Sequence, residues 1–349
     1  MKETSLQHLV CPRREGTRRC GGTLDLARNG LALRRAEDMA DEVLEGLVRC
    51  GVCGAEYPVI SGVLVLVNQV ERYLARFWRA VLSSAALHGT VSEDLARWLE
   101  KHHPDAPGLP SADQRLDVNL PGSMDRLADL VGGDARYGTF AKFLREWQGR
   151  SPYDRLAAFA QGLGVSGGLA IDSGCGAGAM ALRLAPLTGC VLGVDHTFGA
   201  VLLARRLLLH QPRPMNHYEL RRSAEVFELR SAAPAMAACT AAWGVRPMPL
   251  SNADFLVGDS LNLPVATGAA DLVAGANIID VTSLRAALRE SARVLKPGGL
   301  VLLTDPFKVS PATFSVEAAD PVSSLKEFLS SMGLTVLLEE DFVPWVWYL

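Results

Sequence analysis

The sequence contains no apolar run that approaches the roughly 20 residues of a membrane-spanning helix. Its first residues, MKETSLQHLVCP, lack the apolar stretch of a signal peptide, so we expect a cytoplasmic protein. An excess of basic residues is also missing, because 35 Lys and Arg stand against 38 Asp and Glu, giving a net charge of −3. This balance weakens, without excluding, a role in binding the nucleic-acid backbone. The 349 residues are enough for more than one globular domain.

Cysteine is scarce after residue 53: four of the seven cysteines lie in the first 53 residues and only three in the rest of the chain. Cys50 and Cys53 have the spacing that lets two thiolates bind one tetrahedral ion, and Cys11 and Cys20 would complete a four-thiolate site. In a cytosolic chain such a cluster favours a metal over disulfides. We therefore expect a structural zinc ion; the alternatives are a ribbon that has lost its metal and unrelated thiols.

Three regions follow one another along the chain. Residues 1–69 alternate short β-like runs with Gly and Pro, which is typical of a small metal-stapled ribbon. Residues 70–160 show helical periodicity and predict a connecting or cap segment. Residues 161–349 alternate short apolar strands with helical segments, which predicts an α/β domain with a doubly wound, Rossmann-like sheet of seven strands. Within it, residues 211–252 form an insertion in which HYELRRSAEVFELR suggests a hairpin.

A glycine-rich loop, AIDSGCGAGA at 170–179, follows the first expected strand of this domain. Alone it also fits the relaxed dinucleotide fingerprint, which is a weak signal. No GxxxxGK[ST] motif is present, so a Walker-type phosphate loop is not expected.

Acidic residues near the loop narrow the choice of ligand. Asp172 lies two residues before the first glycine, where a carboxylate would repel a pyrophosphate but suits a ligand with an ammonium group. Asp195 ends the second expected strand (VLGVD) and Asp259 ends the third (FLVGD). A helix, the turn Lys-Pro-Gly-Gly at 296–299 and a strand follow.

This combination resembles class I S-adenosylmethionine-dependent methyltransferases over roughly residues 155–349. The resemblance implies a sheet whose last strand is antiparallel. Here the final pair of expected strands, LTVLLEED and VPWVWYL, would supply this antiparallel edge. It also implies that the loop glycines approach the methionine part, that Asp195 holds the ribose hydroxyls and that Asp259 contacts adenine. His196 would either stack on adenine or face solvent. The implied cofactor site comprises Asp172, Gly174, Gly176, Gly178, Asp195, His196, Asp259 and Ser260.

The N-terminal region resembles the zinc-ribbon proteins that activate tRNA and release-factor methyltransferases. Those ribbons have C-P-x-C at the first knuckle, whereas CPRREGTRRC here separates Cys11 from Cys20 by eight residues. The inserted arginines form either an RNA-contacting loop or a solvated one: Arg13, Arg14, Arg18 and Arg19.

The segment GANIIDVTS follows the fourth expected strand. In methyltransferases of this class the segment at this place faces the methyl group. Asn277 and Asp280 are therefore the catalytic candidates for orienting the acceptor or removing its proton. Asn277 lacks the following Pro-Pro-Tyr of enzymes that methylate planar amino groups. A weaker resemblance to the methyltransferase portion of ovothiol-biosynthesis enzymes favours a small-molecule or peptide acceptor, methylated at nitrogen. The alternatives are an RNA or translation-factor methyltransferase that docks through its ribbon, and a non-catalytic cofactor-binding regulator. No membrane partner is expected, and the sequence leaves the oligomeric state open.

Overall fold

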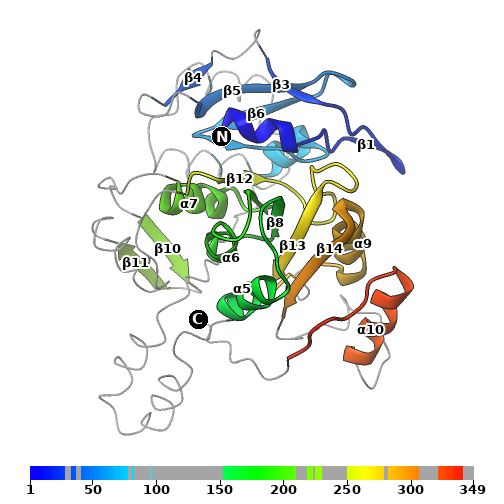
Figure 1. The fold of residues 1–349 in the computed structure, drawn as a ribbon. Helices are drawn as coiled ribbons and strands as arrows, with labels where there is room; N and C mark the ends of the chain where they lie inside the picture. The colour runs from blue at the N-terminus through cyan, green and yellow to red at the C-terminus, as the bar shows by residue number, and fades with distance from the viewer. Residues whose placement is uncertain are drawn as a thin grey trace, which may run out of the picture.

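The computed structural model describes residues 1–27, 33–36, 41–77, 81, 95, 152–209, 218–222, 225–229, 250–278, 282–305 and 321–340. These residues form an antiparallel sheet near the N-terminus and a parallel sheet in the second half of the chain, and a shared hydrophobic core joins the two. In Figure 1 the blue strands of the first sheet lie beside strand β12 (Ala253–Val257) and helix α7 (Phe198–Leu208) of the second. None of the helices in these ranges is both long and apolar enough to cross a membrane.

The parallel sheet confirms the α/β interpretation. Its strand order is β12–β9–β8–β13–β14, and every neighbouring pair is parallel. Strands β8 and β12 are buried along their whole length, as expected where helices cover a parallel sheet. The other strands are β8 (Leu169–Ser173), β9 (Cys190–Asp195), β13 (Ala270–Ala276) and β14 (Leu295–Thr304). The remaining helices are α5 (Pro152–Gly162), α6 (Ala179–Leu184), α9 (Leu284–Val294) and α10 (Pro321–Ser331).

The prediction of a strand at LTVLLEED is wrong, because residues 334–340 form none. Val336, Leu337 and Leu338 are consecutive and are 42%, 58% and 52% exposed. A paired strand would bury alternate side chains on one face, and this segment does not. The other predicted edge strand, VPWVWYL, lies outside the described residues. The described part of the parallel sheet therefore has five strands rather than the expected seven.

Two further predictions for this part of the chain, a turn and a hairpin, agree with the structure. The Lys-Pro-Gly-Gly turn lies within β14, where the pairing moves from Ala270–Leu295 to Leu272–Leu300 and Gly298 has a left-handed φ of +79°. In the insertion, β10 (Tyr218–Arg222) and β11 (Glu225–Leu229) form the expected antiparallel pair.

The N-terminal region is rich in β-strands, as the ribbon prediction requires. Its strand order is β3–β5–β6–β7, and β4 also pairs with β5. A short 3-10 helix, Glu3–His8, precedes it. The strands are β3 (Leu24–Leu26), β4 (Arg34–Arg35), β5 (Val43–Cys50), β6 (Glu56–Ile60) and β7 (Val63–Leu64), with a separate hairpin of β1 (Arg14–Glu15) and β2 (Arg18–Arg19). The chain continues into a helix at residues 70–77, but most of the predicted segment 70–160 lies outside the described residues, so the domain boundaries stay predictions.

The N-terminal sheet joins the parallel sheet at its β12 edge. Val65 forms a parallel bridge with Val257, and the Leu66 N–H donates to the Val257 carbonyl at 2.8 Å. These contacts satisfy backbone groups that an exposed edge strand would leave unpaired. The basic hairpin is also engaged, because Arg19 donates to both carboxylate oxygens of Glu290 at 2.7 and 2.9 Å. This part of the arginine insertion therefore faces the parallel-sheet region.

A buried arginine holds the same interface from inside. Arg205 of α7 is 1% exposed and donates to Glu42, just before β5, at 2.6 Å. It also donates to Asp254 of β12 and, at 3.2 Å, to the Phe255 carbonyl. The second oxygen of Asp254 accepts from the Lys2 N–H at 2.8 Å. Glu42 and Asp254 are 0% and 2% exposed, so one guanidinium compensates a carboxylate of the N-terminal region and one of the parallel sheet.

We expect Arg205→Ala to lower the free energy of unfolding by about 3–5 kcal/mol, because both carboxylates would lose the cation that compensates their burial. The matched control is Lys296→Ala, which breaks an ion pair with Asp271 whose side chains are 46% and 37% exposed. An exposed pair contributes about 0–1 kcal/mol, so that loss should be much smaller. Urea denaturation measures both variants, and equal losses would contradict the importance of the buried network.

Candidate functional site

The glycine loop after β8 contains three left-handed residues. Gly174, Gly176 and Gly178 have φ values of +72°, +50° and +85°, which side chains other than glycine rarely adopt. A Cβ at Gly174 would lie 2.4 Å from Ile278, and one at Gly178 would lie 2.5 Å from Leu208, so packing within the chain excludes both. At Gly176 a Cβ would meet nothing within 4 Å. Gly176 is thus the loop position beside open space, where a ligand can approach the backbone.

Asp172 is a buried carboxylate beneath this loop. It is 1% exposed, and its Oδ2 accepts from the Ala181 N–H, in the first turn of α6, at 2.9 Å. Burial raises the pKa of Asp172 to about 7, the Ala181 hydrogen bond opposes that rise, and the charge of Asp195 adds to it. A nearby cation would favour the ionised form of this group.

Asp195, at the end of β9, connects the glycine loop to the next loop. Its Oδ2 accepts from the Gly176 N–H at 2.9 Å, and its Oδ1 accepts from the Thr197 N–H at 2.8 Å. The sequence predicted that both residues serve one site, and the structure brings them into direct contact.

Asp259 and Ser260 lie in the loop that follows β12, the next strand of the sheet. The Asp259 Oδ1 accepts from the Leu261 N–H at 2.8 Å, and its carbonyl accepts from the Asn262 N–H at 2.9 Å. Because β8, β9 and β12 are parallel neighbours, their carboxyl ends lie at one edge of the sheet. The structure therefore gathers the predicted cofactor residues at this edge.

His196 is solvent-exposed, which agrees with one of the two expectations, and its ring also contacts two aromatic side chains. Its ring lies edge-on to Tyr73 and Phe77, with centroids 5.0 and 5.7 Å away. Desolvation is the main cause that lowers the pKa of His196; Asp259 and Asp195 oppose this effect, and Arg76 adds to it. The sequence reasoning missed Tyr73 and Phe77, and their only signal was an aromatic pair four residues apart in a helical segment.

Asn277, the first catalytic candidate, directly follows β13, on the other side of β8. Its backbone is left-handed, with φ +56°, and its N–H donates to the Thr304 carbonyl at 2.9 Å. Its side-chain Oδ1 is buried and has no hydrogen-bond partner among the residues that the structure describes. Non-glycine residues in this conformation, like buried polar atoms without partners, are uncommon and point to a functional constraint. Asp280, the second candidate, lies outside the described residues.

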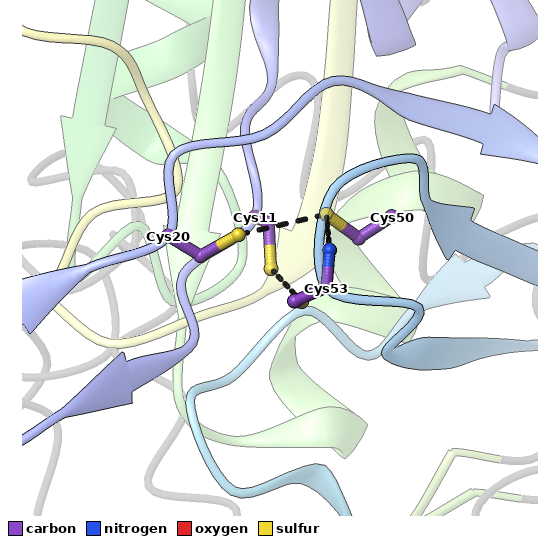
Figure 2. A group of neighbouring side chains, drawn as sticks. All are labelled: Cys11, Cys20, Cys50 and Cys53. Carbon is purple, nitrogen blue, oxygen red and sulfur yellow. Dashed lines mark hydrogen bonds between the residues drawn. The ribbon is translucent and has the colours of Figure 1, made fainter.

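The four early cysteines converge at the tip of the N-terminal sheet (Figure 2). The sulfur atoms of Cys11, Cys20, Cys50 and Cys53 all lie within 4.8 Å of one another. Cys11 is 3.6 Å from Cys53, and Cys20 is 3.7 Å from Cys50. Four sulfurs placed tetrahedrally about 2.3 Å from a zinc ion would be separated by about 3.8 Å, so the donor set fits that metal. These are the same four cysteines that the sequence predicted as metal ligands.

The long spacing between Cys11 and Cys20 is closed by the β1–β2 hairpin. The Cys20 N–H donates to the Arg13 carbonyl at 2.8 Å, and the Gly21 N–H donates to the Cys11 carbonyl at 3.1 Å. The two cysteines therefore return to each other although eight residues separate them. In the opposite knuckle, the N–H groups of Val52 and Cys53 point to the Cys50 sulfur at 3.4 and 3.5 Å, which stabilises a thiolate.

Comparison with known proteins finds one family match and several solved structures of low similarity. Residues 213–303 match a family model described as a methyltransferase domain. Among solved structures, YcgJ from Bacillus subtilis is 24% identical, over 43% of this chain and 49% of that one, with a TM-score of 0.29. The chain thus spans about half of that protein. No curated protein matches.

Two further solved structures cover more of the chain. A putative S-adenosylmethionine-dependent methyltransferase from Methanococcus maripaludis is 16% identical, over 65% of this chain and 73% of that one, with a TM-score of 0.31. A complex between the Haloferax volcanii Trm112 methyltransferase activator and a putative methyltransferase contains a chain that is 18% identical, over 61% of this chain and 76% of that one, with a TM-score of 0.34.

The family match covers β12, β13, α9 and nearly all of β14, and the glycine loop and acidic strand ends lie on the same sheet. Residues 213–303 are therefore similar to a methyltransferase domain.

Proposed function

We propose that the chain transfers a methyl group from S-adenosylmethionine to a small-molecule or peptide acceptor, at nitrogen. The observation that carries the cofactor site is the contact of Asp195 with the Gly176 N–H, beside the open face of the glycine loop. A carboxylate has about four acceptor positions, so Asp195 can receive ribose hydroxyls while it keeps its two backbone donors. The cofactor supplies an electrophilic methyl group on a sulfonium ion.

The other predicted residues have distinct roles in this proposal. Asp172 carries a carboxyl group whose ionised form a cationic ligand favours, which suits a ligand with ammonium and sulfonium groups better than a dinucleotide. Asp259 and Ser260 lie on the next strand end and would contact adenine, and His196 would flank it. Holding donor and acceptor in line supplies about 7–11 kcal/mol in favourable cases, so positioning is the main task of the protein.

Asn277 supports an acceptor that carries a proton. Within the described part of the chain its buried Oδ1 has no partner, and an amide oxygen accepts hydrogen bonds, so an N–H group of the acceptor would satisfy it. Asn277 would then orient the acceptor nitrogen, and Asp280 is the proposed proton acceptor. The engagement of Arg19 with Glu290 reduces the basic charge that the hairpin offers to RNA, which favours a small or peptidic acceptor over a polynucleotide.

Four-cysteine zinc is the second part of the proposal. The donor set fits a tetrahedral ion with no open position, so the role is structural rather than catalytic. The ion would join the β1–β2 hairpin to the Cys50–Cys53 knuckle and so stabilise the region that covers the β12 edge.

Replacing Asp195 by alanine should raise the dissociation constant of S-adenosylmethionine by roughly 10- to 100-fold, since hydrogen bonds to a charged group contribute about 1.5–3 kcal/mol. Isothermal calorimetry measures this directly. Asp271→Asn is the matched control, because Asp271 lies near the amino-terminal end of β13, away from the carboxyl ends of the strands, and its replacement should leave the affinity unchanged. Unchanged binding by Asp195→Ala would refute the cofactor site.

Elemental analysis of the purified protein should find one zinc ion per chain. Cys53→Ser should lower the zinc content and the melting temperature together, because binding of a structural metal contributes to folding. Cys190→Ser is the control, since Cys190 lies on β9, outside the cluster, and should retain full zinc. A wild-type protein without zinc after purification in zinc-containing buffer would contradict this assignment.

The acceptor class can be found with S-[methyl-³H]adenosylmethionine and a cell extract separated into small-molecule, protein and RNA fractions. We expect label in the small-molecule or peptide fraction, and we expect Asn277→Ala to reduce it at least tenfold with unchanged cofactor affinity. Label confined to RNA or to a large protein would favour the ribbon-docking alternative. Cofactor binding without transfer to any fraction would favour a regulator.

A further inference from the structure

The helix that follows the N-terminal sheet reaches the proposed cofactor site. After Leu66 pairs with Val257, the chain enters the helix at residues 70–77. Tyr73 in this helix is 6% exposed, and its hydroxyl donates to the His196 carbonyl at 2.8 Å. His196 lies between Asp195 and Thr197. The Asp195 side chain accepts a hydrogen bond from the Thr197 N–H. The Tyr73 hydroxyl thus acts on the main chain of the loop that carries Asp195.

Aromatic contacts surround this hydrogen bond. Tyr73 and Phe77 lie 5.1 Å apart at an interplanar angle of 52°, and both meet the His196 ring edge-on. The Arg76 guanidinium lies 5.1 Å from the centre of the Phe77 ring. Edge-to-face aromatic pairs have preferred geometries, so the cluster restrains His196 as well as packing against it. A residue of the N-terminal region therefore restrains the 195–197 loop through both its hydroxyl group and its ring.

The restrained loop is directly linked to the glycine loop. Asp195 accepts from Gly176 with one oxygen and from Thr197 with the other, which restrains the orientation of its carboxylate. A shift of the His196 carbonyl would move the Thr197 N–H and with it the carboxylate. Preorganised groups bind more tightly because the cost of ordering them is met before the ligand arrives.

We propose that Tyr73 is a positioning residue of the cofactor site, which holds the 195–197 loop so that Asp195 is preorganised for the cofactor. This inference rests on the proposed role of Asp195 in cofactor binding. It implies that the N-terminal region, through the helix at 70–77, contributes to cofactor affinity without touching the cofactor.

Tyr73→Phe removes the hydroxyl and keeps the ring. We expect the dissociation constants of S-adenosylmethionine and S-adenosylhomocysteine to rise roughly 2- to 12-fold, the range of one neutral hydrogen bond. At saturating cofactor the turnover rate should stay at the wild-type value, and the melting temperature should change little. Arg72→Ala is the control, because Arg72 is exposed on the same helix and bonds only to Gln69 among the described residues.

A double-mutant cycle distinguishes positioning from general damage. If Tyr73 acts through Asp195, Tyr73→Phe should have no further effect on affinity in the Asp195→Ala background. An equal effect in both backgrounds, or wild-type affinity of Tyr73→Phe alone, would overturn the inference while the proposed function stands. Wild-type affinity of Asp195→Ala would instead refute the cofactor site on which the inference rests.

Discussion

The burial of one guanidinium between two sheets is the constraint on which the arrangement of this protein depends. Arg205 compensates Glu42 of the N-terminal region and Asp254 of β12, and all three are almost fully inaccessible to solvent. Removing this guanidinium from the folded protein would leave two buried carboxylates without their shared partner, which costs far more than losing an exposed ion pair. The same interface covers the β12 edge through Val65 and Leu66. The cysteine region is therefore an integral part of the fold.

This attachment brings the N-terminal region to the carboxyl ends of β9 and β12, where the candidate cofactor residues lie. The Val10 N–H donates to the Pro264 carbonyl at 2.9 Å, and the Asn262 amide donates to the Pro12 carbonyl at 2.7 Å. These bonds support the loop after β12, while Tyr73 supports the loop after β9. Two of the loops expected to hold the cofactor thus rest on residues that lie more than 100 positions away in the sequence. A structural metal at the cysteines would act on the site through the same contacts.

Local sequence patterns predicted most of the parallel sheet and the composition of the candidate site. Short apolar strands, a glycine loop and acids at strand ends are local features, and parallel pairing brings strand ends together whatever the loops contain. The prediction failed at residues 334–340, where apolar residues remain exposed. A local run of Val and Leu indicates a strand only if a neighbour is available to pair with it. Tyr73 could not be assigned because its partner is His196, more than 100 residues away.

The sequence by itself determined the candidate chemical groups: four cysteines with metal-binding spacing, a glycine loop and three acids at or near the ends of short apolar strands. These depend on residue type and on spacing within one or two elements, which neighbours along the chain specify. Only the tertiary structure decided that a hairpin brings Cys11 back to Cys20, that Arg205 joins two sheets, and that Tyr73 holds the loop of Asp195. Each of these contacts depends on how separate elements pack, because burial and pairing of distant groups are properties of the whole core.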